Sequence, residues 1–250
     1  MRAIGIIPAR LASSRLPRKL LLAETGRTVL EYTWRAALQA KTLDDVIVAA
    51  DSHEIADVVR KFGGRCELTG DHPSGTDRIA EIARGCCPDA DILVNIQGDE
   101  PELEAANIDL AVQMLRDCPT AQMSTLAAPI RSREQLDAAS CVKVVRGQDG
   151  RALYFSRCPI PFVRDQQPED LLESDTPWLL HIGLYAYRRE FLIDLTRRPP
   201  SRLEQLEKLE QLRALEAGAV IQVGVVERHC VGIDTPEDYA HFVQRQRRAA

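Results

Sequence analysis

The sequence has no long apolar run, no excess of positive charge and no paired-cysteine motif, and each absence excludes a class of protein. No stretch approaches the roughly eighteen apolar residues of a membrane-spanning helix, and Met1 and Arg2 lead directly into a strand without an apolar signal region. A net charge of −5 over 250 residues argues against general binding to nucleic acids or membranes. We therefore expect neither a nucleic acid nor a membrane among the partners.

The seven cysteines are odd in number, and none forms a C-x-x-C pair or has metal-ligand spacing. Neither a disulfide framework nor a cysteine-bound metal is therefore expected. Reduced, mostly buried thiols in a cytoplasmic protein explain this pattern best.

Candidate strands alternate with candidate helices over the first 120 residues. Apolar segments at 3–8, 46–50 and 91–96 are typical of buried strands, and segments at 29–40, 54–62 and 79–87 have helical spacing. This order predicts an α/β fold with a mostly parallel, Rossmann-like sheet. After about residue 121 short strand candidates and prolines replace the alternation, so we interpret 121–200 as a region inserted into a single domain. A long helix expected at 203–218 begins the return of 201–250 to the core formed by 1–120.

The loop after the first strand is rich in cations. No Asp or Glu precedes Glu24, so the five cations of residues 1–23, four of which lie in this loop, have no acidic partner within that segment. Open α/β sheets bind ligands at the carboxyl ends of their strands, and unpaired Arg and Lys suit a phosphorylated anion. The alternative is a solvated basic loop.

Two aspartates could hold a divalent cation. Asp99 follows a buried strand, and Mg²⁺ is typically held by one or two carboxylates plus substrate phosphates. Asp234 is the natural second ligand. Alternatively, Asp99 is a turn residue before Pro101, and Asp234 is only the N-cap of the last helix.

Other polar residues are candidates for binding. In the loop at 71–78, Gly75 permits close backbone approach and Ser74 can donate to a base or a phosphate, although a plain polar loop with a helix cap explains it too. Arg157 can clamp a carboxylate, whereas a lone His181 in an apolar strand is more often structural. The polar residues of the leucine-rich helix, Glu210 and Gln211 among them, are also explained by a solvated face.

Together these segments resemble the cytidylyltransferases that activate 3-deoxy-D-manno-octulosonate (Kdo). The resemblance is carried by I-I-P-A-R-x-x-S-S-R-L-P-x-K at 6–19, D-H-x-S-G-T-D-R at 71–78 and V-N-I-Q-G-D-E-P at 94–101. Further segments match in order: A-L-Y-F-S-R at 152–157, H-I-G-L-Y-A-Y at 181–187, L-E-K-L-E-Q-L-R at 206–213 and G-I-D-T-P-E-D at 232–238. The resemblance therefore runs from the first strand to the last helix.

This resemblance implies a GT-A-like fold of the nucleotide-diphospho-sugar transferases, a Mg²⁺-dependent transfer of CMP from CTP to a sugar acid, and a homodimer joined through the inserted region. Residues implied to bind the nucleotide are Pro8, Ala9, Arg10, Ser13, Arg15, Lys19, Ser74, Arg78 and Gln97. Of these, Lys19 and Arg15 would act with Asp99 in catalysis, and Asp99 and Asp234 would bind the metal. Residues implied to hold the sugar acid are Arg157, His181, Tyr185, Glu210 and Gln211.

One departure and three rival functions follow from the same comparison. Relatives usually have L-P-G-K-P-L where this chain has L-P-R-K-L-L at 16–21. We expect the loss of the glycine and of the second proline, replaced by Arg18 and Leu20, to stiffen or redirect the loop, and Arg18 to add a charge near the phosphates. The rivals are transfer to 8-amino-Kdo or a sialic acid, a CTP-binding homologue without catalysis, and a glycosyltransferase of similar fold. The last is disfavoured because Gln97-Gly98-Asp99 lacks the first residue of an Asp-x-Asp metal pair.

Overall fold

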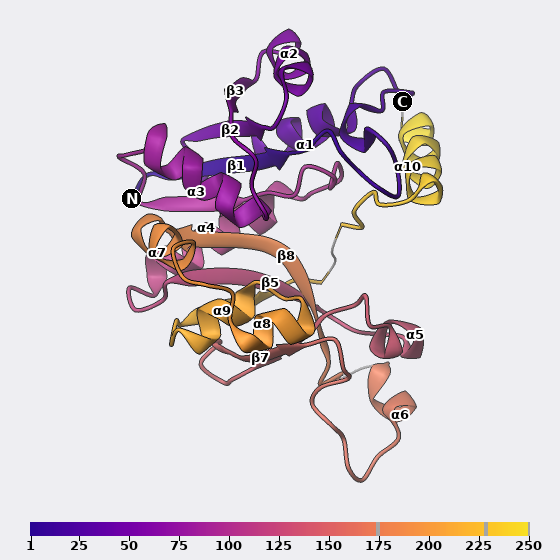
Figure 1. The fold of residues 1–250 in the computed structure, drawn as a ribbon. Coiled ribbons are helices and arrows are strands. Elements are labelled where there is room, and N and C mark those ends of the chain that lie inside the picture. Colours follow the sequence, from indigo (N-terminus) through magenta and orange to yellow (C-terminus); the bar gives the residue numbers. More distant parts are fainter. Residues whose placement is uncertain (174–175, 228–229, 250) are drawn as a thin grey trace. The chain divides into compact units, whose positions relative to one another are not determined.

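The structure, a computed structural model, describes residues 1–173, 176–227 and 230–249. Its internal contacts divide the chain into two compact units, Met1–Val112 with Cys230–Ala250 and Gln113–His229 (Figure 1). The second unit begins before the expected insertion and includes 201–227, which we had grouped with the returning core. That the whole chain acts as a single domain stays a prediction. None of the helices described is both long enough and apolar enough to cross a membrane.

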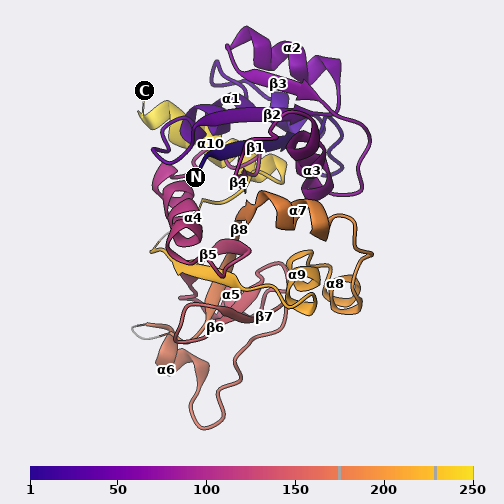
Figure 2. The same cartoon turned by 90° about the vertical axis from the view of Figure 1, so that its left-hand side faces the viewer.

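The first unit is built on a parallel sheet in the order β3-β2-β1-β4. Its strands are β1 (Ala3–Ala9), β2 (Asp45–Ala50), β3 (Arg65–Leu68) and β4 (Ile92–Asn95), and the predicted α/β fold with a mostly parallel sheet is confirmed. The connecting helices are α1 (Val29–Ala37), α2 (His53–Lys61) and α3 (Gly75–Gly85), and α2 lies beside the edge strand β3 in Figures 1 and 2. Helix α4 (Ala105–Asp117) follows β4, and the boundary between the two units falls within it. Six of the seven residues of β1 are buried, as expected for a strand covered on both faces.

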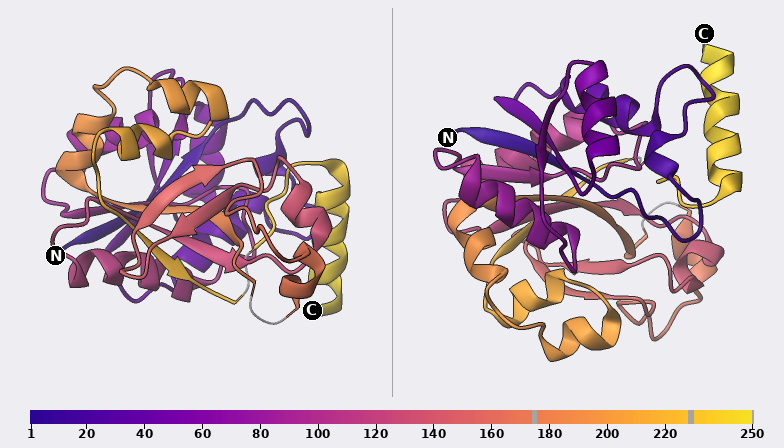
Figure 3. Two further views of the ribbon diagram at one scale, coloured as in Figure 1. Left: turned by 90° about the horizontal axis from the view of Figure 1, so that it is seen from below. Right: turned by 45° about the horizontal axis from the view of Figure 1, so that its top comes forward.

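The last helix packs against the loop that follows β1. Helix α10 (Pro236–Ala249) places Tyr239, Phe242 and Val243 in one apolar cluster with Leu16 and Val29. The Tyr239 hydroxyl accepts a hydrogen bond of 2.9 Å from the Glu24 backbone N–H, and the right-hand view of Figure 3 shows α10 alongside this loop. The return of the chain end to the first strand therefore brings the residues before α10 to the basic loop.

The second unit contains an antiparallel pair, β5 (Met123–Pro129) with β8 (Leu179–Arg188), and β9 (Ile221–Val225) parallel to β5. The strands β6 (Lys143–Arg146) and β7 (Ala152–Ser156) form a hairpin whose bend lies at Gly147 and Gly150. Its helices are α5 (Arg133–Asp137), α6 (Pro168–Leu172), α7 (Arg189–Leu195), α8 (Arg202–Glu207) and α9 (Gln211–Glu216).

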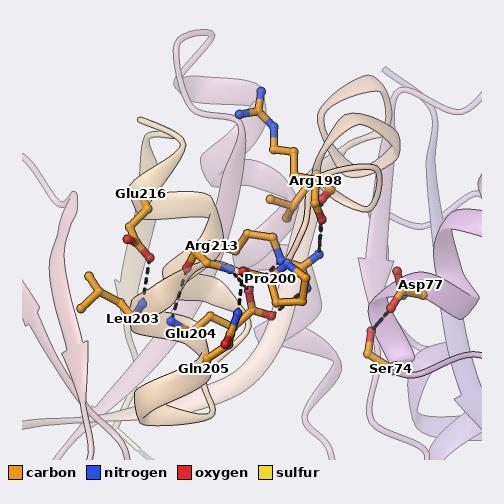
Figure 4. A network of polar contacts seen from close by, with 11 residues as sticks. Ser74, Asp77, Arg198, Pro200, Leu203, Glu204, Gln205, Arg213 and Glu216 are labelled. Carbon is orange, nitrogen blue, oxygen red and sulfur yellow. Dashed lines mark hydrogen bonds and ion pairs between the residues drawn. The ribbon is translucent and has the colours of Figure 1, made fainter.

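The long helix expected at 203–218 is wrong, because the chain breaks there into α8 and α9. Lys208 ends α8 in the left-handed region, with φ at 55°, and its N–H donates to the Glu204 carbonyl. Glu204 forms a capping box with Ser201 and an ion pair with Arg213 across the break (Figure 4). The leucine spacing continues through the break, so the pattern alone gave no sign of it.

Two smaller expectations also need correction. Residues 75–78, expected in a polar loop, form the first turn of α3, with Ser74 as its N-cap. All seven cysteines are free, as expected, but only Cys87 is fully buried and Cys158 is exposed, so the expectation of mostly buried thiols is wrong.

Candidate active site

Lys19 bridges two carboxylates that come from distant parts of the chain. It begins the 3₁₀ turn η1 (Lys19–Leu21), and its ammonium lies 2.5 Å from Asp99 Oδ2 and 2.8 Å from Asp234 Oδ1. Burial alone would lower the pKa of Lys19, but the two carboxylates outweigh it and raise the pKa above its ordinary value. Lys19 therefore stays a cation between two anions.

Cations of the basic loop find partners in distant segments, which the sequence could not show. Arg15 pairs with Asp234 at 2.9 Å, and Arg18 pairs with Glu54. The neighbourhood of Asp99 and Asp234 thus combines two carboxylates with two cations from one loop, Lys19 and Arg15. This is the charge pattern of a site for an anion bound together with a metal ion.

Asp99 and Asp234 fit a hard divalent cation. Their oxygens converge on a single positive charge, the Lys19 ammonium. In the part of the chain that the structure describes, no group of three or more Asp, Glu, His or Cys residues could hold a metal by itself. Two carboxylates completed by substrate phosphates are the usual arrangement for Mg²⁺, which rarely occupies an all-protein cage.

Two guanidinium groups have buried N–H atoms without partners among the described residues. They are the Nη2 of Arg10 and the Nε of Arg78. Burial is the largest cause lowering the pKa of Arg78, and the positive charge of Arg10 lowers it further, so the two groups are electrostatic neighbours. Buried, unpaired donors are costly, and an anionic ligand would satisfy both.

The expected nucleotide-binding segments meet at the end of β1. A Cβ atom added to Gly75 would lie 3.5 Å from Pro8 Cγ, and one added to Gly98 would lie 3.3 Å from the Pro8 carbonyl oxygen. Ala9 is buried beside Pro8, and Ser13 and Gln97 are half-buried in the loops after β1 and β4. The close approach of the loop after β4 to Pro8 is thus favoured by glycine at position 98, whereas a Cβ at position 75 would make an ordinary contact.

The Ser74 hydroxyl is already engaged as a cap. It accepts from the Asp77 N–H at 3.1 Å and donates to Asp77 Oδ2 at 2.7 Å (Figure 4). A role for Ser74 toward a nucleotide base stays a prediction.

Arg18 keeps the backbone conformation that glycine favours. Its φ of 56° and ψ of 28° lie in the left-handed region, which explains the glycine that relatives usually have there. The guanidinium pairs with Glu54 on α2. Arg18 thus adopts a conformation that is unstrained at glycine, and the added charge has a carboxylate partner. That the loop is stiffened or redirected stays a prediction.

We expect Arg18→Gly to keep the free energy of unfolding within about 1 kcal/mol of the wild type, because relieved strain offsets the lost exposed ion pair and the added freedom of the unfolded chain. Arg18→Val should lower it by about 1–2 kcal/mol, because a β-branched side chain opposes a positive φ. Urea unfolding measures both variants. Equal stability of the two would contradict the conformational reason.

The residues expected to hold a sugar acid lie in the second unit. The Arg157 guanidinium donates to the backbone carbonyls of Glu207 at 2.7 Å, Ala139 at 2.8 Å and Lys208 at 3.4 Å. Arg157 therefore ties the end of β7 to the break between α8 and α9. Its expected role toward a carboxylate stays a prediction.

Sequence reasoning missed the buried Lys143. Its ammonium donates to the carbonyls of Ala138 at 2.9 Å, Cys141 at 2.7 Å and Arg157 at 2.9 Å, and the residue has no exposed surface. Burial lowers its pKa. Because a lysine in a short strand segment is ordinary, only the tertiary structure reveals that this one supports the backbone of Arg157.

His181 and Tyr185 lie side by side on β8, with ring centroids 5.3 Å apart. Burial lowers the pKa of His181 to about 3 and raises that of Tyr185, so both rings are neutral at pH 7. The charge of Glu210 adds to the raised pKa of Tyr185, which places Glu210 nearby. Gln211 is buried, and its Nε2 has no partner among the described residues, so the solvated-face alternative is wrong for Gln211.

Comparisons with known proteins identify the family of the chain. The family model described as "Cytidylyltransferase" matches residues 4–223. The chain is 49% identical to the 3-deoxy-manno-octulosonate cytidylyltransferase of Rhodopirellula baltica, covering 98% of each chain. It is also 49% identical to that of Syntrophobacter fumaroxidans, covering 95% of this chain and 94% of the other.

Solved structures show the same fold. A structure of CMP:2-keto-3-deoxy-manno-octonic acid synthetase complexed with CTP has a TM-score of 0.92 and 37% identity, covering 100% of both chains. A 4-diphosphocytidyl-2C-methyl-D-erythritol synthase from Anaerococcus prevotii, at 15% identity and a TM-score of 0.62, shares the fold alone. The chain therefore belongs to the family of the 3-deoxy-manno-octulosonate cytidylyltransferases.

Proposed function

We propose that this protein transfers CMP from CTP to the anomeric hydroxyl of Kdo, giving CMP-Kdo and diphosphate for lipopolysaccharide biosynthesis. The observation that carries the proposal is the cluster of Lys19, Asp99 and Asp234 at the strand ends, in a chain 49% identical to relatives that bear this name. We further propose that the enzyme works in the cytoplasm as a homodimer.

Positioning and charge neutralisation carry the chemistry, because phosphorus centres need little covalent help. Lys19 and Arg15 supply positive charge beside the triphosphate, and the unpaired N–H groups of Arg10 and Arg78 bind the nucleotide. Asp99 and Asp234 would hold Mg²⁺, which when bound neutralises phosphate charge and lowers the pKa of the attacking hydroxyl. Lys19, released from the carboxylates, would then be available to the phosphates.

We assign the sugar acid to the second unit. The residues expected to hold it there include two neutral rings and a buried amide. Gln211 offers the unpaired Nε2 donor, and His181 and Tyr185 offer uncharged polar atoms in the same unit. Such groups recognise hydroxyls, because an unpaired buried donor or acceptor discriminates strongly for a ligand that pairs with it.

The test is diphosphate release from CTP with Mg²⁺, measured with Kdo, 8-amino-Kdo and sialic acid in parallel. Release with Kdo at the highest kcat/KM supports the proposal. Preference for either other acid would reassign the substrate. No release with any of the three, together with CTP binding by calorimetry, would show a CTP-binding homologue without this activity. Omitting Mg²⁺ should abolish release, which tests the metal requirement.

A further inference from the structure

Thr125 lies behind His181 at an irregularity in the sheet. Between Thr125 and Leu126 on β5, the antiparallel register on β8 steps from Tyr185 to Ile182. The Thr125 side chain is fully buried, and its Oγ1 lies 3.0 Å from His181 Nε2. The same oxygen lies 3.0 Å from the Ile182 carbonyl oxygen and 2.9 Å from that of Leu184. A β-bulge of this kind re-aims side chains on the bulged strand.

Counting protons at this oxygen assigns the histidine tautomer. A hydroxyl has one hydrogen, and the two carbonyls can only accept. If the hydroxyl donated to His181, both carbonyl contacts would join unprotonated oxygens at hydrogen-bond distance. If it donates to the carbonyls, its lone pair accepts from His181, which then carries its hydrogen on Nε2. In the second arrangement the one hydroxyl hydrogen is shared between the two carbonyls, and no contact is left without a hydrogen.

The other ring nitrogen is then an acceptor. His181 packs edge-on against Phe155, with ring centroids 5.0 Å apart, and its ring is tilted against that of Tyr185. Burial keeps the ring neutral, with a pKa of about 3, so Nδ1 carries only a lone pair at pH 7. No partner of Nδ1 occurs in the described part of the chain, although the residue keeps some exposed surface.

We propose that Thr125 is a positioning residue that holds His181 in the Nε2–H tautomer, so that Nδ1 accepts a hydrogen bond from a hydroxyl of the sugar acid. The inference rests on the proposed function, because it assigns His181 to the sugar. The inference also assigns the hydroxyl and the carboxylate of the sugar acid to different residues of the protein. A neutral acceptor cannot attract the ligand carboxylate, so His181 selects a hydroxyl, and the carboxylate must be recognised by other donors.

The experiment combines ¹⁵N NMR of the imidazoles with steady-state kinetics. Only five histidines occur in the chain, and His181→Gln identifies the signal of His181 by its loss. The free wild-type protein should show the Nε2–H tautomer at His181, and Thr125→Ser should retain it. Thr125→Val should give a mixture of tautomers and raise KM for Kdo about tenfold, the cost of one misoriented hydrogen bond, with KM for CTP unchanged.

Thr33→Val is the matched control for the spectrum. Thr33 is also fully buried, and its hydroxyl also faces two backbone carbonyls, those of Val29 and Gly98, with no histidine. It should leave the His181 signal unchanged, whereas a change would make the Thr125→Val effect non-specific and overturn the inference.

Other outcomes are equally decisive. An Nδ1–H tautomer in the wild type, or an unchanged tautomer and unchanged KM in Thr125→Val, would overturn the inference. Absence of turnover with Kdo in the wild type would defeat the proposed function and the role of His181 toward the sugar. That failure is distinguishable, because the tautomer is observed in the free protein without any substrate.

Discussion

Asp99→Asn is expected to reduce diphosphate release by about a thousandfold or more while leaving the fold intact. The substitution keeps the shape of the side chain but removes one of the two negative charges that meet at Lys19. Loss of a single electrostatic contact to a transition state typically costs 10²–10³-fold, on the order of 3–4 kcal/mol, and this carboxylate is also assigned to the metal. The measurement is diphosphate release at saturating CTP, Kdo and Mg²⁺.

The matched control for this variant is Asp57→Asn. The Asp57 side chain is 64% exposed and, among the residues described, forms an ion pair only with Arg60 on the surface of α2, so its loss should leave turnover unchanged. Binding of Mn²⁺ in the presence of CTP, followed by electron paramagnetic resonance, should weaken in Asp99→Asn and not in the control. Turnover near the wild-type rate with Mg²⁺ would refute the assignment of Asp99.

Glu204→Gln is expected to lower the free energy of unfolding of the second unit by about 3 kcal/mol. Glu204 and Arg213 form a bidentate pair, with bonds of 2.7 and 2.8 Å, and both side chains are nearly buried at 10% and 11% exposure (Figure 4). Removing one charge of a buried pair leaves the other uncompensated, which typically costs about 3–5 kcal/mol. Glutamine can still complete the capping box with Ser201, so the variant isolates the charge.

Urea unfolding measures this effect by the fluorescence of Trp178, in a Trp34→Phe background that leaves one tryptophan, in the second unit. The control is Asp194→Asn, which breaks the exposed pair of Asp194 with Arg198 and should cost less than about 1 kcal/mol. A loss below about 1 kcal/mol in Glu204→Gln as well would mean that the pair adds little.

The break that this ion pair spans also matters for the site. Arg157 donates to the carbonyls of Glu207 and Lys208 at the break, and Glu210 and Gln211 follow directly after it. The conformation of this segment therefore sets the positions of the residues expected to hold the sugar acid. Loosening it by Glu204→Gln should raise KM for Kdo more than KM for CTP.

Much of the fold was determined locally and could be predicted from the sequence. The alternation of apolar strand segments with helical segments predicted the parallel sheet of the first unit, because burial on both faces and βαβ connection leave a recognisable pattern. The ordered motifs from residue 6 to residue 238 predicted the family, which the comparisons confirmed. These conclusions depend only on residue types and their spacing along the chain.

Tertiary structure alone decided the features that depend on distant partners. Lys19 meets Asp99 and Asp234 across separations of 80 and 215 residues, and no local pattern encodes that approach. The helix break at Lys208 is stabilised by the pairing of Glu204 with Arg213, which leucine periodicity cannot reveal. The tautomer of His181 depends on one hydroxyl of a neighbouring strand. Sequence thus determined which chemical groups are present and which elements carry them. Long-range packing decided which ion-pair and hydrogen-bond partners these groups have and which atoms carry the protons.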